Sequence, residues 1–167
     1  MGGKTQENLY EAFVGEAKAH HRLLAFSRKA EQEGYDQVGK LFRAVAAAEA
    51  IHAERHLCLL GETVVRSSEE NLRYSFEQET TVNQLHYPEF IREAEREGER
   101  AALVTFRQAR DVEGRHAVLY KRALSAMLRE EVHDYYVCRI CGYVAERESP
   151  DQCPICSAGG DEFRLVS

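Results

Sequence analysis

The sequence has 167 residues, of which 44% are hydrophobic, enough for one sizeable domain or for one domain and a small module. The formal net charge of −6 argues against a nucleic-acid partner, and no apolar run approaches the ~18 residues of a membrane span. The N-terminus runs straight into a helical pattern without an apolar leader. Five cysteines in a chain of this kind indicate a reducing compartment, which we expect to be the cytoplasm.

Four long helices are predicted in the first three quarters of the chain, where Ala, Leu, Glu and Arg recur with helical spacing. The predicted helices span residues 5–32, 36–60, 69–96 and 100–131. Pro88 lies inside the third of them and predicts a kink there. From Val132 onward the sequence is rich in Tyr, Val, Cys, Gly and Pro, which are strand and turn residues. We therefore expect two domains, over residues 1–132 and 133–167.

The helical part contains an internal repeat. The segment ENLYEAFVGEA at 7–17 aligns with ENLRYSFEQET at 70–80, at an offset of 63 residues. Two further pairs of segments align at an offset of 64, namely AEQEG with AEREG and EAIH with EGRH. Each half is therefore predicted to be a helical hairpin with one Glu on its first helix and a Glu-x-x-His motif on its second.

The repeat predicts a dinuclear metal site. Residues three apart lie on one face of a helix, so the carboxylate and the imidazole of each Glu-x-x-His motif converge. Four carboxylates in an apolar core need counter-charge, because burying a bare carboxylate costs several kcal/mol, and two divalent metal ions would neutralise them. This ligand set is that of carboxylate-bridged di-iron bundles, and it suits iron or manganese. The predicted ligands are Glu16, Glu49, His52, Glu79, Glu113 and His116.

Some residues near these ligands have competing interpretations. A single Glu-x-x-His motif is usually a solvent-exposed coincidence, but two copies at repeat-related positions are not easily explained in that way. Glu77 is a rival to Glu79, and we favour Glu79 because its helix face also carries apolar residues and His86. His56 follows His52 by one helical turn, and for it a packing or surface role is favoured over a role beside a metal.

The C-terminal part contains a second predicted metal site. Each of its two Cys-x-x-Cys motifs forms a tight turn, and two such turns provide a tetrahedral site of four sulfur ligands. The spacing does not separate a structural zinc ion from a single iron ion. The predicted ligands are Cys138, Cys141, Cys153 and Cys156.

Together the two sites resemble the rubrerythrin family, over nearly the whole chain. The resemblance rests on the segments ENLYEAFVGEA, AEAIHAERH, HYPEF, EGRH and CRICGY…CPIC. It implies a mainly α fold, in which a ferritin-like four-helix bundle precedes a small rubredoxin-like module of strands and loops. It also implies that Glu49 and Glu113 bridge two iron ions and that Glu16 and Glu79 are terminal ligands. The four cysteines would hold a third iron ion, with zinc as the substitute metal.

The sequence departs from the family at one position. Members usually carry a further Glu three residues after the ligand on the third helix, and Val82 occupies that position here. Its counterpart in the first half is Ala19, so the two halves of this chain are more alike than the family pattern implies.

The activity implied by the resemblance is that of a non-haem di-iron peroxidase, which reduces hydrogen peroxide to water in defence against oxidative stress. The rubredoxin-like iron would relay electrons from an external donor such as a rubredoxin or an NAD(P)H-linked reductase. The alternatives are a ferritin-like protein that oxidises and binds iron, and an enzyme that reduces dioxygen. The cysteine module favours electron input, which iron storage does not need.

The connection between the second and third predicted helices indicates an exchanged homodimer. In ferritin-like bundles these two helices run parallel, so the chain must return along a helix of about 37 Å. The eight residues 61–68 reach only about 28 Å when fully extended. Unwound helix ends or a simple up-down-up-down topology would also satisfy this limit. Exchange needs no strain, and we expect helices 5–60 of one chain to pair with helices 69–131 of another.

Overall fold

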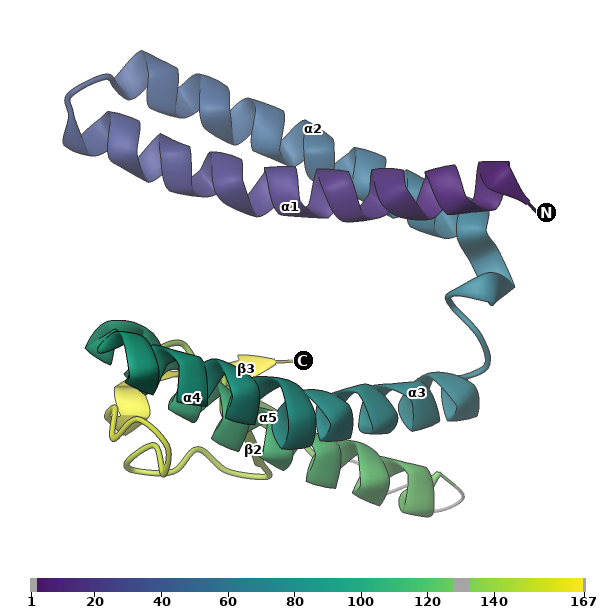
Figure 1. Cartoon of the computed structure of the whole chain (residues 1–167), viewed down its shortest axis with the longest axis vertical. Coiled ribbons are helices and arrows are strands. Elements are labelled where there is room, and N and C mark those ends of the chain that lie inside the picture. Colours follow the sequence, from purple (N-terminus) through teal and green to yellow (C-terminus); the bar gives the residue numbers. More distant parts are fainter. Residues whose placement is uncertain (1–2, 128–132, 167) are drawn as a thin grey trace. The chain divides into compact units, whose positions relative to one another are not determined.

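The computed structural model describes residues 3–127 and 133–166, and within these the chain is mainly helical (Figure 1). The α-helices are α1 (Lys4–Gln32), α2 (Asp36–Leu60), α3 (Ser68–Thr81), α4 (Tyr87–Glu97) and α5 (Arg100–Ala126). None of the helices in the described ranges is long and apolar enough to cross a membrane. The chain divides into two units, Met1–Ser67 and Ser68–Ser167, which are described separately.

The predicted helices are confirmed with one change. The third is divided by a π-helical turn, η2 (Val82–His86), directly before Pro88. The predicted end of the fourth helix at residue 131 lies outside the described residues. The domain boundary predicted between residues 132 and 133 also falls there, and the division into 1–132 and 133–167 stays a prediction.

In the first unit, α1 and α2 form a hairpin, and most of its buried residues are small. Ser27, Ala30, Gly39, Ala46 and Ala53 are buried between the two helices. A Cβ atom on Gly39 would lie 2.9 Å from the side chain of Glu31 and 3.3 Å from the Ser27 carbonyl oxygen. The helices can therefore approach closely, which brings polar side chains on the two facing surfaces within bonding distance.

The second unit repeats this hairpin with α3, η2 and α4 packed on α5. In each hairpin the turn contains a glycine at positive φ, +82° at Gly34 and +75° at Gly98, which ends the preceding helix. An arginine–glutamate pair joins the two helices of each hairpin at equivalent positions, and so does a pair of phenylalanines with ring centroids 5.7 Å apart. These pairs are Arg43–Glu31 with Arg107–Glu95, and Phe26–Phe42 with Phe90–Phe106.

The π-helical turn accommodates one residue that the first half lacks. His20 and Asn83, at an offset of 63, both bond to a main-chain carbonyl on the facing helix. Phe26 and Phe90, at an offset of 64, occupy equivalent positions in their ring pairs. The extra residue therefore lies between Asn83 and Phe90, where η2 widens the helix by one residue in a single turn.

The C-terminal module is a three-stranded antiparallel sheet in the order β2-β1-β3. Its strands are β1 (Tyr135–Cys138), β2 (Val144–Glu146) and β3 (Phe163–Val166). Tyr136 pairs with Ala145 on one side and with Leu165 on the other. The sheet is small. Cys138 ends β1, the other three cysteines of the module lie in the loops, and Cys138 and Cys153 are fully buried.

Deleting the exposed residue Leu85 should be tolerated, because the deletion restores the ten-residue spacing that separates Glu16 from Phe26 in the first half. We expect η2 to become regular α-helix while the contacts on both sides of it persist. Deleting the exposed Arg22 from α1 is the matched control. It should rotate half of α1 by about 100° and strongly destabilise the hairpin. Circular dichroism and thermal unfolding would measure both effects, and equal destabilisation by the two deletions would contradict this explanation of η2.

Candidate metal centres

The first helical hairpin brings together three of the predicted ligands. Glu16 projects from α1, and Glu49 and His52 project from α2, so that one ligand atom from each lies within 4.8 Å of the others. The Nδ1 atom of His52 is 3.0 Å from a carboxylate oxygen of Glu49 and 3.8 Å from one of Glu16. The i, i+3 spacing on α2 and the close approach of α1 therefore produce the convergence that the repeat predicts.

The second hairpin reproduces this cluster with Glu79 from α3 and with Glu113 and His116 from α5. The Nδ1 atom of His116 is again 3.0 Å from one carboxylate and 3.8 Å from the other. Glu79 is thus the residue that joins the cluster, whereas its rival Glu77 is exposed to solvent. Val82 begins η2 and offers no ligand atom, so the two clusters have the same composition.

The carboxylates in each cluster are close enough to perturb each other. Burial, the hydrogen bond with Glu113 and the negative charge of Glu113 raise the pKa of Glu79 to about 8. In the first cluster, the hydrogen bond with Glu49 and burial raise the pKa of Glu16. Hydrogen bonds with Glu16 and His52 lower the pKa of Glu49. In each pair the neighbouring carboxylate therefore disfavours ionisation of its partner, and a divalent cation would remove the repulsion that raises these pKa values.

Interhelical hydrogen bonds fix the position of each cluster. The Nδ1 atom of His20 donates to the carbonyl of Ala46 over 2.8 Å, three residues before Glu49. Asn83 donates in the same way to the carbonyl of Arg110, three residues before Glu113. His86, which we expected on the face of Glu79, is instead exposed at the end of η2. The extra residue explains this difference, because the widened turn η2 lies between Glu79 and His86 and rotates His86 away from the face of Glu79, while Asn83 occupies the position of His20.

The four cysteine sulfurs lie in one cluster in the C-terminal module. The Sγ atoms of Cys138 and Cys156 are 3.7 Å apart, and those of Cys141 and Cys153 are 3.6 Å apart. A tetrahedral site with metal–sulfur bonds of about 2.3 Å has edges of about 3.8 Å, so the sulfurs fit one bound ion. Main-chain amides of Tyr143, Ile155 and Ala158 bond to the sulfurs and favour the thiolate form that a metal requires.

A hydrogen bond links this module to the second helical cluster. The Nε2 atom of His116 donates to the carbonyl of Gly142, the residue after Cys141, over 3.2 Å. A histidine that donates from Nε2 keeps Nδ1 available for a metal ion, and Nδ1 is the atom that faces Glu79 and Glu113. The shortest path from Cys141 to the carboxylates therefore runs through the backbone of Gly142, a hydrogen bond and the imidazole of His116.

Two further residues lie near the clusters: Tyr87, which no motif in the sequence indicates, and His56, for which the sequence favours a packing or surface role. Burial and the charges of Glu113 and Glu79 raise the pKa of Tyr87, which places this phenol beside the second cluster. The hydrogen bond with Glu49 and burial raise the pKa of Glu16, and the half-buried His56 opposes that rise through its charge, so it lies beside the first cluster. The position of Tyr87 could not be inferred because it depends on the π-helical turn.

Comparisons with known proteins agree with both sites. Residues 7–124 match the family described as rubrerythrin, and residues 136–164 match its rubredoxin-like domain. Nigerythrin of Nitratidesulfovibrio vulgaris is 35% identical over 173 residues, which cover 96% of this chain and 86% of that protein. Rubrerythrin-2 of Clostridium acetobutylicum is 32% identical over 175 residues, which cover 96% of this chain and 95% of that protein.

The fold also matches solved structures. The structure of partially reduced nigerythrin aligns with a TM-score of 0.60 and 34% sequence identity, and the alignment covers 99% of this chain and 88% of that one. The family carries a dinuclear iron site in its helices and an iron site of four cysteines in its rubredoxin-like domain, and the donor sets described above fit both. The chain therefore belongs to the rubrerythrin family.

Proposed function

We propose that this chain is a non-haem di-iron peroxidase, which reduces hydrogen peroxide to water with electrons relayed through its cysteine-bound iron. The observation that carries the proposal is the hydrogen bond between His116 and Gly142, which connects a redox-type sulfur site to a carboxylate–histidine cluster. An iron-storage protein has no need of such an electron input. The reaction consumes one hydrogen peroxide, two protons and two electrons and yields two water molecules.

The ligand roles in this proposal follow the family pattern. Glu49 and Glu113 would bridge the two iron ions, and Glu16 and Glu79 would each complete one ion as a terminal ligand. His52 and His116 would bind through Nδ1, the atom that each directs at its carboxylates. Two ferrous ions held in this way would supply the two electrons that cleave the oxygen–oxygen bond.

Electrons for the next turnover would enter through the C-terminal module. An external donor, such as a rubredoxin or an NAD(P)H-linked reductase, would reduce the iron held by Cys138, Cys141, Cys153 and Cys156. Amide hydrogen bonds to the sulfurs and burial of two of the cysteines are the features that tune the potential of such a site. The path to the helical cluster then follows Cys141, Gly142 and His116.

The experiment that tests the function is stopped-flow mixing of the fully reduced protein with hydrogen peroxide and, separately, with dioxygen. A peroxidase should be oxidised much faster by peroxide than by dioxygen. A faster reaction with dioxygen would identify a dioxygen reductase. Uptake of many added ferrous ions per chain in the presence of oxygen would identify an iron-storage function.

Replacing Glu49 or Glu113 with Ala should abolish or cripple dinuclear metal binding, since either change removes a bridging ligand. The visible absorption of the cysteine-bound iron should persist, because its ligands lie in the separate C-terminal module. Iron content per chain and the visible spectrum measure the two sites independently. Glu77→Ala is the control that should leave both unchanged, and loss of both signals in Glu113→Ala would refute the two-site assignment.

Metal binding should release protons at neutral pH, because Glu79 has a pKa of about 8 in the metal-free protein and must ionise to bind a cation. Folding raises this pKa from its ordinary value of 4.5, so Glu79 stabilises the metal-free fold when protonated. That contribution is complete below pH 4.5 and is lost as the pH rises through about 8. Calorimetry in buffers of different ionisation enthalpy counts the released protons. Glu79→Gln should remove the part of the release that belongs to this residue.

Assembly by exchange of helical hairpins is the arrangement that we propose for the six-ligand site. In the structure Gly61–Thr63 forms a helical turn, so only residues 64–67 remain to connect α2 with α3. Four residues span about 14 Å, whereas the 25 residues of α2 span about 37 Å. On α2, the exposed side chains of Val38, Leu41 and Val45 continue the helix face of Glu49, as expected of a surface that packs on another helical pair.

A complementation experiment tests this exchange. In a mixed dimer of Glu49→Ala and Glu113→Ala chains, exchange would place both lesions in one site and leave the other site intact. Peroxidase activity should therefore reappear on mixing the unfolded chains and refolding them together with iron. Mixing Glu49→Ala with a second chain that carries the same substitution is the control without recovery. No recovery in the heterologous mixture would mean that each chain builds its own site.

A further inference from the structure

The side chain of Arg115 connects α5 with the C-terminal module. Arg115 stands between the ligands Glu113 and His116 in the sequence, but it binds to neither of them. Its Nε atom donates to the carbonyl of Val144 over 3.1 Å, and its terminal nitrogen donates to Glu146 over 2.9 Å. Its guanidinium also lies over the ring of Tyr143, 5.9 Å from the centroid. These three contacts all lie on the segment that follows Cys141.

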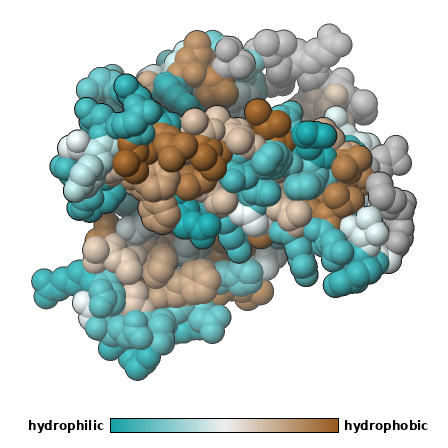
Figure 2. Space-filling model, turned by 90° about the horizontal axis from the view of Figure 1, so that it is seen from above, coloured by the Kyte–Doolittle hydropathy of each residue, from teal (hydrophilic) through white to brown (hydrophobic). Residues whose placement is uncertain are grey.

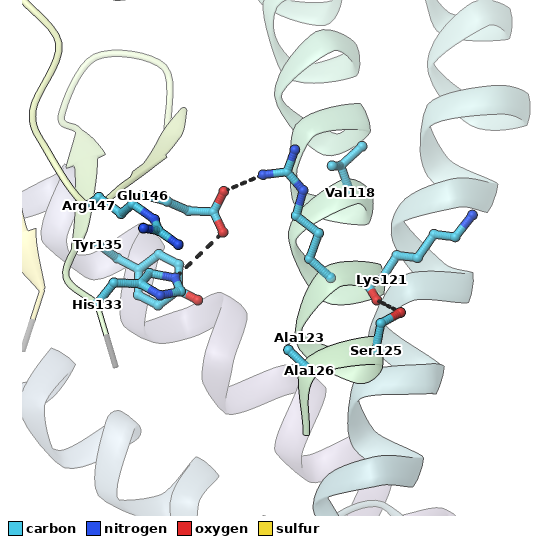
Figure 3. Close-up of a pocket in the computed structure, with 10 residues that line it drawn as sticks. Val118, Lys121, Ala123, Ser125, Ala126, His133, Tyr135, Glu146 and Arg147 are labelled. Carbon is cyan, nitrogen blue, oxygen red and sulfur yellow. Dashed lines mark hydrogen bonds and ion pairs between the residues drawn. The ribbon is translucent and has the colours of Figure 1, made fainter. Parts of the chain in front are cut away.

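Glu146 is the anionic centre of this contact. Its side chain is only 16% exposed, and Arg122 and His133 also lie within ion-pair distance, at 2.7 and 3.6 Å (Figure 3). Burial raises the pKa of Glu146, but the hydrogen bond and charge of Arg115 and the charge of Arg122 outweigh it, so the net pKa is lowered. Arg115 is 20% exposed while Arg122 is 62% exposed, so the Arg115 pair is the more shielded from solvent.

Beside the contacts of Arg115, Gly142 of the module lies against the predicted metal ligand His116. Gly142 has a φ of +83°, and a Cβ atom at this position would lie 3.9 Å from Val112 on α5. The positive φ favours glycine and turns the carbonyl of residue 142 to the Nε2 atom of His116. Two residues further along the module, Arg115 donates a hydrogen bond to the carbonyl of Val144. The neighbouring α5 residues Arg115 and His116 therefore both bind the segment 142–144.

In residues 3–67, the described part of the first half, there is no equivalent of this arrangement. The repeat aligns Arg115 with Ile51, whose side chain is 57% exposed. The side chain of His52 is 51% exposed, whereas that of His116 is 23% exposed. The internal repeat is therefore broken by a charged side chain at a position that contacts the module.

We propose that Arg115 is a positioning residue that docks the C-terminal module on α5 and so makes His116, rather than His52, the entry point for electrons. The proposal rests on the electron relay proposed above. In each transfer, one electron would pass from the iron held by the four cysteines to the dinuclear site, so that the first would be oxidised from ferrous to ferric and one ion of the second reduced from ferric to ferrous. Two such transfers would be needed for each peroxide molecule reduced, and they would make or break no covalent bond. The external donor would then reduce the cysteine-bound iron again.

The docking part of the proposal is tested without any turnover. The full chain is loaded with zinc, and nuclear magnetic resonance records the Nε2 proton of His116 and the tumbling of the module. In Arg115→Met the proton should exchange much faster, and the module should tumble more freely. Arg122→Met is the matched control, since it removes a more exposed partner of the same Glu146 and should leave the His116 signal in place.

The electron-entry part is tested in the iron-loaded protein. Reduced protein is mixed with peroxide, and the recovery of the visible band of the cysteine-bound iron reports electron flow into the dinuclear site. A hydrogen-bonded charge pair of this kind is worth about a tenfold change in the docked population, so Arg115→Met should slow the recovery about tenfold. The first oxidation of the dinuclear site by peroxide should keep its wild-type rate. Glu146→Gln tests the same contact from the module and covers the case in which Arg115→Met does not fold.

The outcomes separate this proposal from the peroxidase assignment. Unchanged band recovery together with an unchanged His116 signal in both Arg115→Met and Glu146→Gln would overturn the role of Arg115. An unreactive wild-type protein would overturn the peroxidase assignment, while the zinc-loaded protein would still decide whether Arg115 docks the module. An altered His116 signal with unchanged electron transfer would refute the entry through His116.

Discussion

The close approach of two carboxylates within each helical hairpin is the interaction on which the rest of the structure depends. Burial and Glu113 raise the pKa of Glu79 to about 8, Glu49 raises the pKa of Glu16, and a cation bound between the carboxylates would remove this repulsion. Such pairs form because small residues line the helix contact, with Ala46 fully buried three residues before Glu49. The packing that stabilises each hairpin thus also creates the charge that a metal must neutralise. Apolar side chains also gather in patches on the outer surface of the helices (Figure 2).

Much of this architecture follows from the sequence, because it depends on local periodicity. The i, i+3 spacing of Glu49 and His52 determines their convergence whatever the rest of the chain does, and the repeat transfers the argument to Glu113 and His116. The helix ends at Gly34 and Gly98 were predictable for the same reason, since positive φ at glycine is a local property. The position of Glu79 in the cluster, with Glu77 exposed, agrees with the apolar face of α3 that the sequence indicates, and its role as a ligand stays a prediction.

Features that depend on tertiary contacts could not be predicted in this way. The change of the repeat offset from 63 to 64 reveals that one residue is inserted in the second half. It does not reveal whether that residue produces a loop, a kink or a π-helical turn. The structure shows η2, because both flanking segments keep their packing on α5 only if the extra residue widens one turn. Arg115 was equally hidden, since an arginine on a helix usually lies in solvent and nothing local indicates that Glu146 lies opposite it.

The two halves of the chain therefore have the same ligands but different surroundings. A symmetric pair of clusters would give the two metal ions equal access to electrons, since His52 and His116 have matching distances to their carboxylates. The symmetry is broken outside the ligands, by one added residue at η2 and by Arg115 in place of Ile51. Changes at such positions leave the coordination chemistry intact, because they touch no ligand atom. Repetition can thus supply the metal site, while differences between the repeats determine the route by which electrons reach it.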